Sequence, residues 1–134
     1  MRLRTQLTIF ILILSLARCS LIGDYKSDKK VSPSKRYYLI TTVNRTDRDK
    51  KDYASVVIHL YDSYEHLLSE VDTRSGDASS WAVGWDKSRD TIILFSSDIN
   101  NEAFKIENGE IKPIERSDEI NKRADELYKE KYRQ

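Results

Sequence analysis

The sequence is poor in the residues that form cross-links, metal sites and phosphate-binding loops. Its 134 residues include one cysteine, two histidines, four glycines and two prolines. A single cysteine excludes an intramolecular disulfide and a cysteine-based structural zinc site. Four glycines leave little room for a glycine-rich loop around a phosphate. These absences argue against nucleotide-dependent chemistry and against a metal or cofactor.

The sequence also lacks an excess of charge of one sign. It has 23 basic and 22 acidic residues, and 39% of its residues are hydrophobic, enough for the core of one domain. Without Arg2, Arg4 and Arg18, 20 basic residues face 22 acidic ones, a formal charge of −2. Basic and acidic residues alternate, as in Asp47-Arg48-Asp49-Lys50-Lys51-Asp52. A nucleic-acid partner is therefore not expected, because phosphate binding needs a basic stripe.

No apolar run is long enough to span a bilayer, but a shorter one stands at the beginning. Met1-Arg2-Leu3-Arg4 is followed by the apolar stretch from Leu7 to Leu14 and by small residues near Ala17. A membrane-spanning helix needs about 20 apolar residues. A positive start, a short apolar centre and small residues after it are typical of a secretory signal peptide. Residues 1–18 are therefore predicted to direct export through a bacterial inner membrane.

The sequence Leu16-Ala17-Arg18-Cys19 ends this segment on the only cysteine. It resembles the lipobox of bacterial lipoproteins, in which an aliphatic and a small residue precede the cysteine that receives diacylglycerol. The resemblance implies lipid attachment at Cys19, with palmitate-type acyl chains that hold the protein in a membrane. Ser20 implies the outer membrane rather than the inner one, on the periplasmic side. Arg18 departs from the family pattern, which has a very small residue there.

A second processing route remains open. Ser15-Leu16-Ala17 presents small residues at the two positions that an ordinary signal peptidase reads. Cleavage after Ala17 would release a soluble periplasmic protein beginning at Arg18. The position of the lone cysteine favours lipidation over this alternative.

The remaining chain divides into a polar spacer and a β domain. Residues 19–35 are predicted to form the lipidated cysteine and a flexible tether, because they contain Ser, Lys, Asp, Gly and Pro and little to bury. Residues 36–134 are predicted to form a mainly β domain with one C-terminal helix. Segments with strand composition and turn signals between them give about seven strands, at residues 37–43, 55–61, 66–71, 81–85, 91–96, 103–106 and 110–113. We expect an antiparallel meander that forms a curled sheet or a small sandwich.

Asn108-Gly109 is the strongest local signal, because a type I′ turn needs positive φ at both residues. A two-residue loop there would place Glu107 opposite Glu110 and Phe104 opposite Pro113. Phe104 and Pro113 should then share the core face with Ile106 and Ile111. Proline in this register requires its strand to be an edge.

The last segment has the features of a helix. Ser117 can cap it, and Asp118 and Glu119 suit its positive first turn. The apolar residues recur at helical spacing on one face: Ile120, Ala124, Leu127 and Tyr128. The helix should pack on the sheet or cover one of its edges.

Residues with catalytic potential do not form a recognisable motif, so an enzyme is not expected. Ser96, Ser97, Asp98 and His59 are the residue types of a hydrolase triad, but no Gly-x-Ser-x-Gly surrounds either serine. Ser97-Asp98 is ordinary turn chemistry.

Aromatic residues are the weak candidates for ligand binding. Trp81 and Trp85 would share one face of a strand, with small Ala82 and Gly84 on the other. That pattern favours burial in the core over an exposed aromatic platform. Tyr61 and Tyr64 are better suited to a mixed surface, because their hydroxyls tolerate water.

Two classes of function follow. The first is an envelope lipoprotein that binds a protein partner in the periplasm without catalysis, for example an immunity-type factor that blocks a toxin. The second is an envelope module that holds a glycan or a lipophilic ligand or has a structural role. A hollow barrel would favour the second class, and a filled sheet with an exposed acidic or aromatic patch would favour the first.

Overall fold

The computed structural model describes residues 25–44 and 54–133, and the predicted signal peptide and Cys19 lie outside this range. In these ranges the protein is mainly β, with eight antiparallel strands in two sheets and one C-terminal helix. The first sheet has the order β1 (Lys30–Val31), β2 (Tyr37–Asn44), β3 (Ser55–Asp62) and β4 (Leu67–Gly76). The second has the order β5 (Trp81–Trp85), β6 (Ile92–Ser96), β7 (Glu102–Glu107) and β8 (Glu110–Ile114). The helix α2 spans Asp118–Tyr132.

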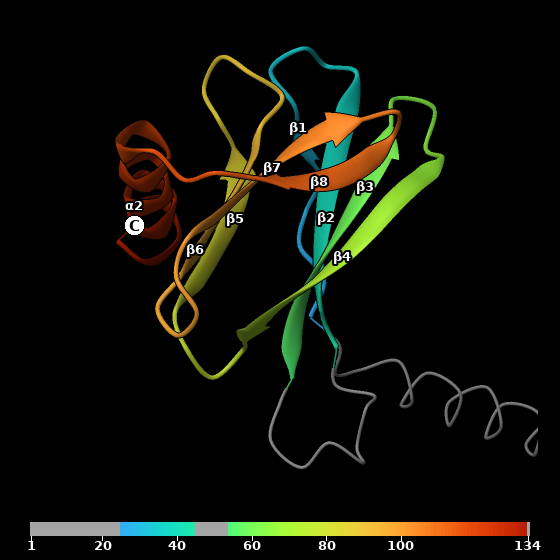
Figure 1. Cartoon of the computed structure of the whole chain (residues 1–134). Helices are drawn as coiled ribbons and strands as arrows, with labels where there is room; N and C mark the ends of the chain where they lie inside the picture. Colours follow the sequence, from blue (N-terminus) through green and yellow to red (C-terminus); the bar gives the residue numbers. More distant parts are fainter. Residues whose placement is uncertain (1–24, 45–53, 134) are drawn as a thin grey trace, which may run out of the picture.

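The elements form three layers (Figure 1). The second sheet lies in the middle, with the first sheet on one face and α2 on the other, against β5 and β6. The predicted fold class is confirmed, and its sandwich form is the one observed. Each sheet is a simple meander, because every strand pairs with its neighbours in sequence.

The space between the sheets contains the larger of two apolar cores. Alternate residues of β2 and β3, such as Leu39, Ile58 and Leu60, meet the inward faces of β5 and β6. Trp81 and Trp85 are buried there, which confirms that they belong to the core. Strand β6 is apolar on both faces because Ile92 and Leu94 face the first sheet while Ile93 faces α2.

The β7–β8 hairpin has the predicted register. Glu107 pairs with Glu110 and Phe104 with Pro113. Asn108 (φ 52°) and Gly109 (φ 76°) both adopt the left-handed backbone that the turn requires. Strand β8 is an edge, as proline predicts. The side chain of Pro113, however, is exposed rather than part of the core.

Helix α2 begins as predicted. The hydroxyl of Ser117 accepts a hydrogen bond from the Ile120 N–H, and the acidic residues occupy the first turn. Ala124 and Leu127 are buried against the outward face of the second sheet, where Ala82, Ile93 and Ala103 provide a flat surface. The helix therefore packs on a sheet face rather than on an edge.

Two predicted boundaries need correction. The tether was expected to extend to residue 35, but Lys26 pairs with Thr42, and β1 pairs with β2 through Lys30–Leu39 and Val31–Tyr38. This segment is held by backbone hydrogen bonds, which a polar composition does not reveal. Strand β4 also continues to Gly76, through a region where a loop was expected.

Candidate functional site

The outer face of the first sheet, which points away from the second sheet, presents a row of apolar and aromatic side chains across all four strands. Cross-strand pairing aligns Val31 with Tyr38, Tyr38 with Tyr61, and Tyr61 with Leu67. The rings of Tyr38 and Tyr61 stack, with centroids 4.9 Å apart and planes 3° apart. We call these four residues the aromatic row. Its middle is fixed by stacking, and its two ends are exposed, Val31 at 58% and Leu67 at 49%.

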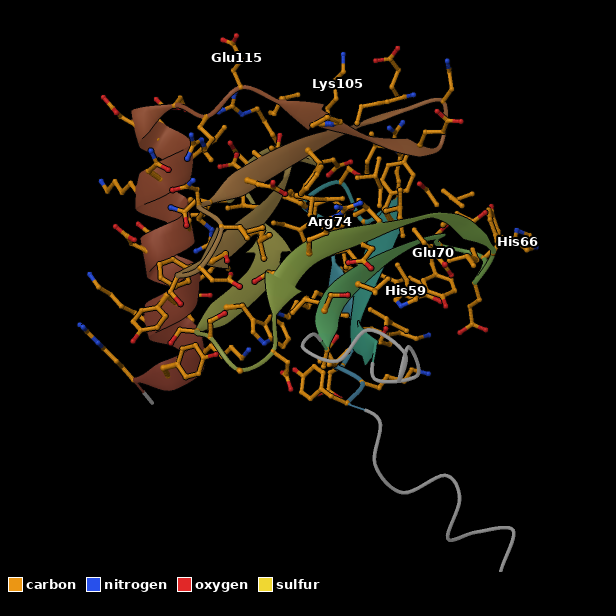
Figure 2. The ribbon with its side chains drawn as sticks, turned by 60° about the horizontal axis from the view of Figure 1, so that its bottom comes forward. His59, His66, Glu70, Arg74, Lys105 and Glu115 are labelled. Atoms are coloured by element: carbon orange, nitrogen blue, oxygen red, sulfur yellow. The ribbon has the colours of Figure 1, made fainter. Side chains whose placement is uncertain are left out.

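A polar row lies beside the aromatic row on the same face. His59 is flanked by Thr42, whose Oγ1 is 2.6 Å from Nε2, and by Glu70, whose Oε1 is 3.1 Å from Nδ1. Figure 2 shows His59 and Glu70 next to each other on adjacent strands. Sequence reasoning missed this group because a β-bulge between Leu60 and Tyr61 shifts the pairing of β3 with β4.

A hydroxyl, an imidazole and a carboxylate in this order also occur in hydrolase triads, so the surroundings of Thr42 matter. A nucleophile needs hydrogen-bond donors aimed at the developing oxyanion. Strand β2 is paired on both sides, with β3 on one and with β1 and Lys26 on the other. The N–H groups next to Thr42 are engaged, that of Thr41 by the Ser27 hydroxyl at 2.8 Å and that of Val43 by the Tyr25 carbonyl. The group is better explained as cross-strand hydrogen bonding that orders the outer face.

The β3–β4 hairpin extends the aromatic row beyond the end of the sheet. Its tip is held by Asp62, whose carboxylate accepts hydrogen bonds from the N–H groups of Tyr64 and His66, both at 2.9 Å. These bonds, above all those from His66, lower the pKa of Asp62. Tyr64 is 81% exposed at this tip. A fixed backbone thus presents an exposed aromatic ring.

Carboxylates surround this exposed end. Glu65 pairs with Lys29 at 2.7 Å, and Lys29 also lies 4.6 Å from the centre of the Tyr38 ring. Asp62 is in the hairpin, and Glu70 and Asp72 are exposed on β4. The surface around the aromatic row is therefore mixed, with carboxylates and basic groups side by side.

The predicted ligand-binding residues separate into two groups. Trp81 and Trp85 are 4% and 6% exposed, so they form no surface platform. Their indole N–H groups donate to Asp77 (3.3 Å) and to the Lys30 carbonyl (2.8 Å). Tyr61 and Tyr64 lie at the same end of β3 and belong to the outer face and its hairpin.

The structure brings Ser96 and Asp98 together but keeps His59 apart from them. Ser96 donates to Asp98 at 2.5 Å and lies 2.9 Å from the Ser75 hydroxyl, in a polar cluster that joins β4 to the β6–β7 turn. Ser97 accepts from the Ser80 N–H. His59 is on the outer face of the first sheet, away from all of these.

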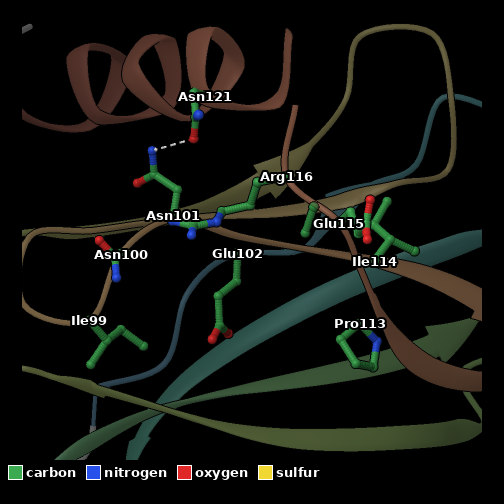
Figure 3. A pocket seen from close by; sticks show the side chains of 10 residues that line it. Ile99, Asn100, Asn101, Glu102, Pro113, Ile114, Glu115, Arg116 and Asn121 are labelled. Atoms are coloured by element: carbon green, nitrogen blue, oxygen red, sulfur yellow. Dashed lines mark hydrogen bonds between the residues drawn. The ribbon is translucent and has the colours of Figure 1, made fainter. Parts of the chain in front are cut away.

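An open depression lies beside β7, β8 and the start of α2 (Figure 3). It has a volume of about 800 Å³. Asn101 donates to Asn121 across its upper wall at 3.2 Å. Burial raises the pKa of Glu102, and Arg116 partly opposes that effect. Its lining has no aromatic ring: Ile99, Asn100, Asn101, Glu102, Ala103, Pro113, Ile114, Glu115, Arg116 and Asn121.

In the part of the chain that the structure describes, no group of three or more His, Cys, Asp or Glu residues is placed to hold a metal ion. None of the described helices has the length and apolar character needed to cross a membrane. Comparison of the chain with protein-family models, with curated proteins and with solved structures finds no match.

Proposed function

We propose that this protein is a non-catalytic protein-binding module of the bacterial cell envelope, anchored to a membrane through lipid on Cys19. The outer membrane, on its periplasmic side, is the expected location, and an immunity-type protective factor is the kind of role we infer. The observation that carries the binding role is the aromatic row, which continues into the exposed Tyr64 of the β3–β4 hairpin.

The filled interior supports recognition through the surface. Trp81, Trp85 and Phe104 occupy the space between the sheets, together with the aliphatic residues of β2 and β3. A small sandwich packed in this way binds a partner on a face or a loop rather than inside. The exposed Tyr64, next to the exposed Leu67 and the half-buried Tyr61 with polar groups around them, has the composition typical of protein interfaces.

The position of the hairpin also supports this role. The described chain begins at Tyr25, and Lys26 pairs with Thr42 near one end of β2. The β3–β4 hairpin lies at the other end, where Tyr37 pairs with Asp62. A lipid on Cys19 would then hold the domain by one end and leave the hairpin directed away from the membrane. Tethering raises the effective concentration of the module where a periplasmic partner arrives.

The anchor is tested by the intact mass of the mature protein purified from membranes. Wild type should carry diacylglyceryl on Cys19 and stay with the membrane fraction, and Cys19→Ala should lose both properties. A soluble wild-type product that begins at Arg18 would contradict the anchor and leave export in place.

The binding surface is tested by a photo-crosslinking amino acid in cells. Placed at Tyr64, it should give a discrete adduct with a periplasmic protein, and Leu67→Ala with Val31→Ala should weaken that adduct. The same group at Asp125, exposed on α2, is the matched control. Equal adducts at both positions, or none at Tyr64 in any growth condition, would argue against the hairpin as the binding surface.

The depression in Figure 3 is the feature that favours the alternative, a module that binds a glycan. Its amides and charged groups could hydrogen-bond sugar hydroxyls, although it lacks the aromatic ring that often stacks on a sugar. Binding of cell-wall fragments measured by calorimetry, lost in Asn101→Ala and unchanged in Tyr64→Ala, would support the alternative over the proposed function.

A further inference from the structure

Tyrosines gather at the end of the domain where the described chain begins. The Tyr25 ring packs edge-on against Trp81, with centroids 5.5 Å apart. The Tyr132 hydroxyl, from the last turn of α2, accepts from the Trp81 N–H at 3.2 Å. Tyr128 packs beside Tyr132, at 5.0 Å between centroids. Tyr25 and Tyr132 are 40% and 46% exposed, so both rings are partly in contact with solvent.

Basic residues stand next to these tyrosines in the sequence. Lys26, Lys129 and Arg133 are exposed. Lys131 is half-buried, with its ammonium 3.1 Å from the centre of the Trp81 ring. We call this end, formed by Tyr25, Lys26 and residues 129–133, the anchor end.

Two carboxylates, Asp28 and Asp77, are also near, and both contribute to a raised pKa of Tyr25, after burial and Tyr132. Asp77 is engaged by the indole N–H of Trp81. Glu130, also in the anchor end, pairs with Arg123 at 2.8 Å. The anchor end therefore has one more basic side chain (Lys26, Lys129, Lys131 and Arg133) than carboxylates (Asp28, Asp77 and Glu130).

The chain length between the predicted lipid and the domain is short. Only residues 20–24 separate Cys19 from Tyr25. Even fully extended, this stretch spans at most about 20 Å. A tether through residue 35 would have let the domain turn freely, but pairing of residues 26–31 with β2 removes that freedom. The anchor end must therefore remain close to the lipid headgroups.

We propose that the anchor end binds the anionic headgroups of the membrane that carries the lipid anchor, which orients the β3–β4 hairpin away from the surface. Tyrosines favour the headgroup level, where one part of the ring is apolar and the hydroxyl is hydrated. Lysine and arginine side chains are attracted to anionic lipids within a Debye length of the surface. The acyl chains on Cys19 would hold the protein on the membrane, and the basic surface would add an electrostatic attraction that selects one orientation. This inference rests on the proposed lipid anchor.

The test uses the mature lipidated protein in vesicles of phosphatidylcholine alone or with phosphatidylglycerol. Lipid occupies the only native thiol, so an introduced cysteine is the only labelling site. A fluorophore at Ala78→Cys, in the exposed β4–β5 turn beside Trp81, reports on the anchor end. One at Ser63→Cys, in the exposed β3–β4 turn, is the matched control at the opposite end. Quenching by lipids with nitroxide headgroups measures how close each label lies to the membrane.

In phosphatidylglycerol vesicles, the label at residue 78 should be quenched and the label at residue 63 should not. Lys129→Glu with Arg133→Glu should lower the ratio of docked to undocked protein by about 25-fold or more, because each basic residue near an anionic surface contributes about a fivefold factor. Lys105→Glu with Lys122→Glu, an equal change of charge elsewhere, should leave the quenching unchanged. Equal quenching at both labels, or no effect of the reversal at residues 129 and 133, would overturn the proposal.

The intact mass of the protein distinguishes a failure of this inference from a failure of the proposed lipid anchor. If Cys19 carries lipid and the two labels behave alike, the anchor stands and the docking surface is wrong. If the product is instead the soluble chain beginning at Arg18, binding of that chain to the same vesicles is measured by flotation. Flotation only with the vesicles that contain phosphatidylglycerol, and its loss in the Lys129→Glu and Arg133→Glu variant, would support the anchor end as a membrane-binding surface. No flotation with either kind of vesicle would overturn the proposal.

Discussion

Lys131 shows how a single charged residue can be held in a partly apolar site. Its ammonium lies over the Trp81 ring and donates to the Trp81 carbonyl at 2.7 Å. Burial, with a smaller contribution from the neighbouring Lys30, lowers the pKa of Lys131 to about 8, while Asp77 acts in the opposite direction. The aliphatic stem can pack on the indole while the charged group keeps one strong hydrogen-bond acceptor.

The lowered pKa of Lys131 predicts a specific dependence of stability on pH. Below pH 8 the amine is protonated in both the folded and the unfolded protein, so the cost of burying the charge is fully present. Between about pH 8 and 10.5 the folded protein releases this proton first, so stability rises with pH. After allowance for solvent screening, wild type should gain about 1 kcal/mol relative to Lys131→Met between pH 7 and pH 9.5.

Urea unfolding of both proteins at the two pH values measures this difference directly, since other titrating groups cancel in the comparison. An identical pH dependence of the two proteins would show that the ammonium is not desolvated. Lys129→Met, an exposed change in the same helical turn, should follow wild type at both pH values.

At the scale of single elements, strand β5 shows how an edge of the sandwich is closed. Three alternate carbonyls of β5 point away from β6, and each accepts from a cationic side chain. Trp81 accepts from Lys131, Val83 from Lys30, and Trp85 from Arg123 Nε at 2.9 Å. An open row of carbonyls would invite pairing with another strand. Side chains of helix α2 and of β1 thus supply hydrogen-bond donors to the carbonyls of this edge.

Gly84 sets how closely α2 approaches β5. A Cβ added at Gly84 would lie 2.5 Å from Cδ2 of Leu127, a contact that requires the leucine or the helix to move. Gly84→Ala should therefore destabilise the protein by about 1–2 kcal/mol through overpacking. Urea or thermal unfolding monitored by tryptophan fluorescence would measure the loss.

A double-mutant cycle identifies the cause of that loss. Leu127→Ala should itself cost about 2–4 kcal/mol through a cavity, but Gly84→Ala added to it should be nearly neutral. Additive effects of the two changes would show that Gly84 is needed for a reason other than contact with Leu127.

At the scale of the whole molecule, polar contacts supplement the apolar core that joins the two sheets. Asp98 accepts from the hydroxyls of Ser96 and Ser75 and from the Gly76 N–H at 2.9 Å. Ser75 is fully buried at the end of β4. The cluster therefore ties the last residues of the first sheet to the β6–β7 turn of the second.

Asp98→Ala should lower the free energy of unfolding by about 1–3 kcal/mol, because the Gly76 N–H and the serine hydroxyls lose their acceptor. Asp98→Asn retains an acceptor oxygen and should lose less. Asp125→Ala on the exposed face of α2 is the control and should change stability by less than about 0.5 kcal/mol. Chemical unfolding of the three variants gives the comparison. Equal stability of Asp98→Ala and wild type would show that water replaces the carboxylate without cost.

Much of the β domain was predictable because its signals are local. Alternation of apolar residues located β3, and the two-residue Asn108-Gly109 turn determined the pairing of β7 with β8. Ser117 located the start of α2. The polar row of Thr42, His59 and Glu70 was not predictable, because a bulge changes which residues of β3 and β4 are opposite each other.

The sequence by itself determined the fold class, the positions of seven strands and of the helix, and most of the buried faces, since each depends on residues near one another in the chain. It also carries the predictions of export and of lipid on Cys19, which concern residues outside the described structure. Only the tertiary structure decided that residues 25–35 belong to the domain, because their pairing with β2 is made by backbone groups that every residue possesses. It alone decided that the tyrosines and cations of Tyr25, Lys26 and the end of α2 meet, because residues about 100 positions apart come together only when the two sheets and the helix pack.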